Sequence, residues 1–141
     1  MRVVGISFDH MHMGDLLRLV HDHPGAEIVG VYDQDRSKMS GAIANFAIPD
    51  AQVFTDFDGC MQATKPDLAI LCSAPADHAT YTERLAAYRT HVLVEKPFAA
   101  SIADARRMIA VMALTGKLLA IDWPSAFAPC NVTAKRLIDE G

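Results

Sequence analysis

The sequence contains little that would suit it to secretion, to a membrane or to nucleic acid. Its three cysteines, Cys60, Cys72 and Cys130, are an odd number at wide spacing with no C-x-x-C pair, so neither a disulfide framework nor a zinc knuckle is expected. We interpret all three as buried thiols. Apolar stretches such as Leu68 to Cys72 are far too short to cross a bilayer. The absence of a basic run argues against a nucleic-acid partner.

Other absences narrow the class further. The first apolar run is interrupted by Asp9, His10 and His12, which argues against a secretory signal and favours a cytoplasmic protein. No internal repeat, low-complexity segment or linker is evident. What remains is a chain of 141 residues, 51% hydrophobic and 21% charged, with a formal net charge of -4. These values are typical of one soluble globular domain that has a hydrophobic core of its own.

Short apolar runs alternate with segments of helical periodicity along the whole chain. Strands are expected at residues 2–7, 27–32, 52–54, 67–72, 91–94 and 118–121. Helices are expected from 13 to about 20, from about 36 to 46, up to 63 with Asp56 or Asp58 as its cap, and at 77–89, 101–114 and about 130–140. The strands are apolar on both faces. This order predicts an α/β fold, a doubly wound parallel sheet of about six strands with helices on both faces.

In a sheet of this kind ligands bind at the carboxyl ends of the strands. Asp33 ends the second expected strand, about 20 residues past the first turn, where a carboxylate can bind both hydroxyls of an adenosine ribose. A 2′-phosphate would meet this carboxylate, so NAD is expected rather than NADP. Gln34 offers no positive charge to bind this phosphate, and Arg36 is the cation that could reach it. The alternative is that Asp33 caps the following helix.

The first turn lacks the glycines of a G-x-G-x-x-G fingerprint and reads Ser7-Phe-Asp-His-Met-His12. Amides at the start of the next helix can still hold a diphosphate, helped by Ser7 or by the imidazoles of His10 and His12. Asp9 would repel the diphosphate if it pointed inward. The cofactor contacts expected from this turn are Ser7, Phe8, His10, Met11 and His12.

The same turn has an alternative interpretation as a metal site. Asp9, His10 and His12 carry ligand-type side chains, and His21 or His23 could complete the set. This spacing matches no recognised ligand motif, and His21 and His23 are more simply the solvated end of a helix. We therefore expect no metal.

A third segment, Glu95-Lys96-Pro97, follows a strand of valine and leucine and places a cation where a nicotinamide ring would lie. The stretch from Val92 to Pro97 closely resembles the signature of the Gfo/Idh/MocA oxidoreductases, the glucose-fructose oxidoreductase and inositol dehydrogenase group. The resemblance extends along the chain through Val3–His12, Val29–Asp33, Ile70–Pro75 with His78, and Ala134–Gly141.

The resemblance implies an NAD(P)-binding Rossmann domain over residues 1–141 and hydride transfer between NAD and the hydroxyl or carbonyl carbon of a sugar, polyol or cyclitol. Lys96 is the implied catalytic residue, which would orient the reacting hydroxyl and assist proton transfer; otherwise it is a surface lysine at a strand end. Glu95 would hold the nicotinamide ribose, and Pro97 would follow a cis peptide bond. The other implied cofactor contacts are Ser73, Ala74, Pro75, Asp122, Trp123 and His78.

Two of these contacts have particular interpretations. His78 is expected to cap its helix near the ribose. Trp123 either approaches the nicotinamide or covers the edge of the sheet.

Members of the resembled family continue into a second α/β domain that supplies the substrate pocket, the oligomer interface and a catalytic histidine. The sequence ends at Gly141, so we expect a truncated chain or a natural fragment that is inactive by itself and that could self-associate through exposed apolar surface. Two alternatives stay open: a non-catalytic NAD-responsive module, and a regulatory or scaffold domain that no longer binds nucleotide.

Overall fold

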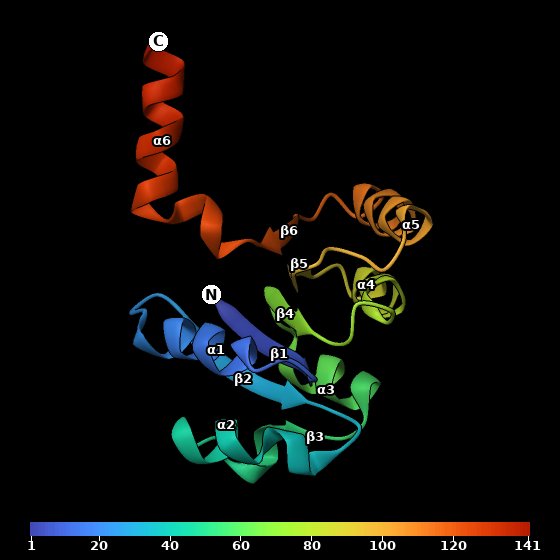
Figure 1. The fold of residues 1–141 in the computed structure, drawn as a ribbon. Helices are drawn as coiled ribbons and strands as arrows, with labels where there is room; N and C mark the ends of the chain where they lie inside the picture. The colour runs from blue at the N-terminus through green and yellow to red at the C-terminus, as the bar shows by residue number, and fades with distance from the viewer.

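The computed structural model describes every residue from Met1 to Gly141. Six strands form one parallel sheet in the order β3-β2-β1-β4-β5-β6 (Figure 1). The strands are β1 (Arg2–Phe8), β2 (Glu27–Tyr32), β3 (Val53–Phe54), β4 (Leu68–Cys72), β5 (His91–Glu95) and β6 (Leu119–Asp122). Strand order reverses between β1 and β4, the switch point at which doubly wound sheets bind ligands. The fold predicted from the sequence is confirmed.

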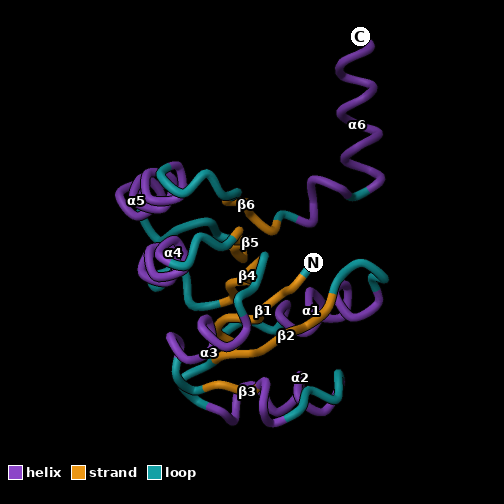
Figure 2. The backbone as a smooth tube through the Cα atoms, turned by 180° about the vertical axis from the view of Figure 1, so that it is seen from behind, coloured by secondary structure: helices purple, strands orange, loops and turns teal.

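Helices cover both faces of the sheet (Figure 2). One face packs against α1 and α2, and the other against α3, α4 and α5. The final helix, α6, extends away from the sheet beyond β6 (Figure 1) and buries none of its residues. None of the helices is long and apolar enough to cross a membrane. Their bounds are α1 (His12–Asp22), α2 (Ser40–Asn45), α3 (Phe57–Thr64), α4 (His78–Ala87), α5 (Ile102–Ala113) and α6 (Pro129–Glu140).

The core consists of two apolar layers, one on each face of the sheet. Val3 and Val4 are neighbours on β1, are both 0% exposed, and belong to opposite layers. Side chains alternate between the faces of a strand, so a strand covered on both sides reads as a continuous apolar run. Gly30 on β2 lets α3 approach closely, because a Cβ there would lie 2.7 Å from Cγ2 of Thr64.

Helix caps account for two of the predicted helix starts. Asp56, rather than Asp58, caps α3: its Oδ2 accepts a 2.9 Å hydrogen bond from the backbone N–H of Gly59. Ser101, the first residue of the helix expected at 101–114, caps α5, with its Oγ accepting from the backbone N–H of Asp104 at 3.1 Å. Such contacts satisfy backbone donors that the first turn of a helix leaves free.

The helical stretch expected from about 36 to 46 is present, as a 3-10 turn, Arg36–Met39, followed directly by the short α2, where Ser40 and Gly41 have weak helix propensity. The expectation for the cysteines is wrong in one case. Cys60 and Cys72 are buried as expected, whereas Cys130 is exposed. Cys130 lies on α6, whose residues pack against no part of the core.

Candidate functional site

A groove of about 710 Å³ lies at the switch point of the sheet. Its walls come from the residues that follow β1, β2 and β4 and from the first turns of α4. The lining residues are Ser7, Asp9, Asp33, Gln34, Asp35, Lys38, Ala74, Asp77, Thr80, Tyr81 and Arg84. Three of the segments expected to carry function therefore meet in one place.

The first turn keeps a sharp backbone bend although it lacks glycine. Ser7 has a φ of 60°, in the left-handed region that favours glycine. The register between β1 and β4 shifts between Ile6 and Phe8, so Ser7 is the residue at which the strand departs from its partner. Ser7 thus occupies the place of the first fingerprint glycine in conformation as well as in sequence.

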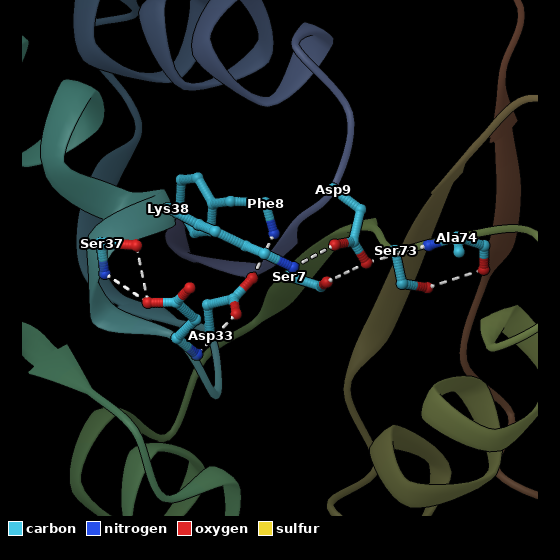
Figure 3. Close-up of polar contacts among 9 residues, drawn as sticks. Ser7, Phe8, Asp9, Asp33, Ser37, Lys38, Ser73 and Ala74 are labelled. Carbon is cyan, nitrogen blue, oxygen red and sulfur yellow. Dashed lines mark hydrogen bonds and ion pairs between the residues drawn. The ribbon is translucent and has the colours of Figure 1, made fainter.

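The carboxylate of Asp9 points across the groove (Figure 3). Its Oδ2 accepts hydrogen bonds from Oγ of Ser7 at 3.0 Å and from the backbone N–H of Ala74 at 3.1 Å. Its Oδ1 pairs with Nζ of Lys38. Burial disfavours the charged form, but the hydrogen bonds from Lys38, Ser7 and Ala74 outweigh it and lower the pKa of Asp9. An ionised carboxylate therefore occupies the space between the strand ends.

Asp33 joins β2 to the first turn. It is buried, and its Oδ2 accepts from the backbone N–H of Phe8 at 2.8 Å while Oδ1 accepts from that of Asp35 at 2.9 Å (Figure 3). The helical cap of the next turn is Asp35, whose Oδ1 accepts from the backbone N–H of Ser37. The alternative that Asp33 serves as the cap is therefore wrong, and its carboxylate lines the groove.

Two cations line the groove that sequence reasoning missed, Lys38 and Arg84. The hydrogen bond to Asp9 and the charge of Asp33 raise the pKa of Lys38. Arg36 is the cation that could have reached a 2′-phosphate on the ribose. It pairs instead with Asp50 at 2.8 Å on the surface. No sequence fingerprint marks the position of Lys38.

A second cluster lies at the carboxyl ends of β5 and β6. Glu95 is 1% exposed, with Oε2 3.1 Å from Nδ1 of His12 and Oε1 3.7 Å from Nζ of Lys96. Asp122 is the register partner of Glu95 in the sheet. Burial, followed by the charge of Glu95, raises the pKa of Asp122. The Lys96–Pro97 peptide bond is cis, as expected.

His10 and His12 face this second cluster. Their ring centroids lie 4.4 Å apart, and ligand-type atoms of His10, His12 and Glu95 all lie within 4.8 Å of one another. The metal set considered from the sequence does not assemble. Asp9 pairs with Lys38, and the ring of His21 lies against Phe46. The Nδ1 of His23 accepts a hydrogen bond from the backbone N–H of Gly25.

His78 is fully buried and has a different role from the one expected. Its Nε2 lies 3.0 Å from the carbonyl oxygen of Ser73 and its Nδ1 lies 3.1 Å from that of Phe98. The residue before α4 is Asp77, and no side chain caps this helix. The expected cap is therefore wrong, because the ring nitrogens face two carbonyl oxygens and no helix N–H. His78 ties the end of β4 to the loop after Pro97.

The remaining expected contacts are spread more widely. The side chain of Phe8 packs partly into the core, and that of Met11 is 84% exposed. Pro75 is partly exposed beside Ala74. Trp123 is 50% exposed and lines a separate hollow with Ser125 and Lys135. Of these four, none lines the groove at Asp33.

Strand order, the sharp turn after β1 and the buried acid at the end of β2 define a Rossmann-type dinucleotide-binding domain. Residues 2–122 match the family model described as the Gfo/Idh/MocA oxidoreductase family, NAD-binding Rossmann fold. The chain belongs to this family.

Similar proteins support the assignment. The chain is 27% identical to D-apiose dehydrogenase from Paraburkholderia graminis over 99% of its length, and 26% identical to inositol 2-dehydrogenase from Salmonella typhimurium over 99%. It superimposes on the WlbA dehydrogenase from Bordetella pertussis, solved with NADH and UDP-GlcNAcA, with a TM-score of 0.88 at 18% identity over 100% of the chain and 40% of WlbA. The chain spans 36% of the length of the first dehydrogenase and 41% of the second.

The residues present fit NAD. The groove holds a buried carboxylate at the ribose position and a backbone bend at the diphosphate position, and Glu95 has a buried Oε1 that accepts no hydrogen bond. The departure from the fingerprint is the side chain of Asp9, which takes up room that a glycine would leave free.

Proposed function

We propose that this domain binds NAD across the carboxyl ends of its strands and serves hydride transfer at a hydroxyl or carbonyl carbon of a sugar, polyol or cyclitol. The observation that carries the proposal is the position of Asp33, buried at the end of β2, bonded to the backbone of Phe8 and facing the groove. A carboxylate there accepts hydrogen bonds from the two hydroxyls of an adenosine ribose and disfavours a 2′-phosphate.

The diphosphate would lie over the first turn. Backbone amides at the start of α1, the Oγ of Ser7 and the backbone N–H of Ala74 are the donors in reach, with His10 and His12 beside them. Phe8 and Met11 would contribute backbone atoms, rather than side chains, to the diphosphate site. Asp9 has to leave its contact with Ala74 for the phosphates to enter, and Lys38 can follow it because this pair is partly exposed.

The nicotinamide half would lie towards β5 and β6. Glu95 accepts from the ribose there, and Asp122 and Trp123 bound the ring. Ser73 and Pro75 form the floor after β4, held in place by the ring of His78. His78 thus acts as a positioning residue.

Lys96 is the candidate catalytic residue, since its partly exposed Nζ lies beside the expected ring position and 3.7 Å from Oε1 of Glu95. Bound NAD supplies the hydride acceptor. The ammonium group of Lys96 donates a hydrogen bond to the reacting oxygen, stabilises negative charge that develops on it, and takes part in its proton transfer. Glu95 keeps Lys96 directed towards that point.

The family relatives named above act on apiose and inositol, which favours a polyhydroxylated substrate. We propose that residues 1–141 form the cofactor domain and that a second domain of the kind found in the family selects the substrate. Three unpaired thiols favour a reducing, cytoplasmic location. Exposed apolar side chains such as Phe127 and Ile138 favour self-association.

The test is a titration of the fluorescence of Trp123 with NADH and, separately, with NADPH, checked by calorimetry. Saturable binding of NADH at a lower concentration than NADPH is expected. A second candidate, a domain that no longer binds nucleotide, is favoured by the Asp9 contact that fills the groove. If neither the wild type nor Asp9→Asn binds NADH or NADPH, that second candidate is supported.

A further inference from the structure

We infer that His10, His12 and Glu95 form a binding site for a divalent transition-metal ion, with Zn²⁺ as its representative. One nitrogen of each imidazole and one carboxylate oxygen lie within 4.8 Å of one another. The three residues come from the first turn, the start of α1 and the end of β5. Because His12 and Glu95 are 83 positions apart, no sequence motif reveals the set.

The donor set has the chemistry of a metal site. Two imidazole nitrogens and one carboxylate oxygen are a ligand set used for Zn²⁺ when a further position stays open to water or substrate. Imidazole also suits the neighbouring divalent metals of the first transition row, whereas Mg²⁺ and Ca²⁺ prefer oxygen ligands alone.

Glu95 supplies the independent observation that points to a ligand. The residue is 1% exposed, and its Oε1 is buried without a hydrogen-bond partner. A buried carboxylate oxygen left unsatisfied is costly. Nζ of Lys96 stands 3.7 Å away, too far for a hydrogen bond. A divalent cation held by both oxygens of Glu95 would give Oε1 the partner that it lacks, while Oε2 is the oxygen next to Nδ1 of His12.

The two imidazoles can complete the coordination with small movements. Ligand atoms about 2.0–2.1 Å from a tetrahedral ion lie roughly 3.4 Å from one another, so atoms that now lie within 4.8 Å of one another have to approach by at most roughly 1.4 Å. Oε2 of Glu95 and Nδ1 of His12 are already 3.1 Å apart. Both histidines are only partly buried, so their rings are free to turn. Glu95 at the end of a strand is the rigid member.

The site overlaps the place proposed for the nicotinamide ribose, because both use Glu95. Metal and NADH are therefore expected to compete. The metal site itself does not require that the domain bind NAD, so the two proposals can fail separately.

The experiment uses the chain prepared without a polyhistidine tag and dialysed free of metal. Calorimetry with Zn²⁺ is expected to show one ion bound per chain, and Co²⁺ to produce the visible absorption of a site with nitrogen ligands. His10→Ala, His12→Ala and Glu95→Gln should each weaken Zn²⁺ binding at least tenfold. The matched controls are His21→Ala and His23→Ala, which remove histidines outside the cluster and should bind as the wild type does.

Circular dichroism and thermal unfolding establish that each variant is folded, and His10→Ala, on the partly exposed turn, is the safest of the three. Absence of Zn²⁺ binding in the wild type would overturn the inference. So would undiminished binding in folded His10→Ala and Glu95→Gln, or a loss confined to the control variants. A titration of the metal-free chain with NADH tests the proposed function separately.

Discussion

The carboxylate of Asp9, just past β1, accepts a 3.1 Å hydrogen bond from the backbone N–H of Ala74, just past β4. The same oxygen accepts from Ser7, and the other oxygen pairs with Lys38. A side chain thus holds together the two strand ends at the switch point of the sheet. In a fingerprint of glycines this space is open to the diphosphate of a dinucleotide.

Asp9→Asn is therefore expected to strengthen NADH binding. The substitution removes a negative charge next to two phosphates while keeping the size of the side chain. One charge at about 4 Å is worth roughly 1 kcal/mol in a watery groove, which corresponds to an affinity gain of about threefold to tenfold. Calorimetry measures the change, with Asp22→Asn on the exposed end of α1 as the control for net charge. Weaker binding in Asp9→Asn would mean that Asp9 helps to hold the cofactor.

Ser7→Gly is expected to be more stable than Ser7→Ala. Ser7 adopts a φ of 60°, which strains a residue with a Cβ by about 1–2 kcal/mol, whereas glycine adopts it freely. Both variants lose the hydrogen bond from Oγ to Asp9, so the free energy of unfolding of Ser7→Gly, measured with urea, should exceed that of Ser7→Ala by about 0.5–1 kcal/mol once the greater entropy of unfolded glycine is subtracted.

Ser7→Ala is the matched control, since it keeps the strain and loses the hydrogen bond to Asp9. It should be less stable than the wild type. If Ser7→Gly and Ser7→Ala unfold at the same denaturant concentration, backbone strain at this turn contributes nothing.

The strand pattern allowed the fold to be predicted because its signal is local. Five of the six strands are runs of apolar residues flanked by turn residues, and their order follows from alternation with helices. The weakest strand, β3, is only Val53–Phe54, yet its position was still apparent from its spacing.

The groove was less predictable because it depends on contacts between segments far apart in sequence. Asp33 could be placed because its position relative to the first turn is typical of the fold. Lys38, Arg84 and the direction of Asp9 could not, since each depends on how a loop turns over a strand end. The buried position of His78 was missed for the same reason: Phe98, which its ring meets, lies 20 residues away.

Asp33→Asn tests the choice between NAD and NADP. With its carboxylate gone, a 2′-phosphate meets the cations of Lys38 and Arg84 in the same groove. The ratio of the NADPH dissociation constant to that of NADH should fall by about tenfold, the effect of roughly 1.4 kcal/mol. Asp22→Asn, on the exposed end of α1 and outside the groove, removes an equal charge and should leave the ratio nearly unchanged. An unchanged ratio in Asp33→Asn would assign cofactor preference to other residues.

The three thiols should react very differently. Burial raises the pKa of Cys60 and of Cys72 to about 12, whereas Cys130 is exposed. Because the thiolate is the reactive form, a thiol reagent at pH 8 should modify only Cys130 in the folded chain and all three cysteines in denaturant. Cys130→Ser should then show no fast-reacting thiol. Fast labelling of Cys60 or Cys72 would contradict their burial.

The same two thiols make stability depend on alkaline pH. In the unfolded chain they lose their protons near the ordinary pKa of 9.0, while in the fold they keep them to about 12. The unfolded state therefore binds fewer protons in this range, and the contribution of the two thiols falls as pH rises from about 9 towards 12. This contribution is measured by urea unfolding of the wild type and of Cys60→Ala at pH 8 and at pH 10. The free energy of unfolding should fall less between pH 8 and pH 10 in the variant than in the wild type.

His78→Ala tests whether His78 positions neighbouring segments or contacts the cofactor directly. The ring lies between the carbonyl oxygens of Ser73 and Phe98 in a fully buried position and its N–H donates to one of them, so its removal leaves a cavity and an unsatisfied acceptor. We expect the free energy of unfolding to fall by about 2–4 kcal/mol, with His21→Ala on the surface of α1 as the control. His78→Asn, which can still donate to one carbonyl, should recover part of the loss. Full stability in folded His78→Ala, combined with lost NADH binding, would instead make His78 a direct cofactor contact.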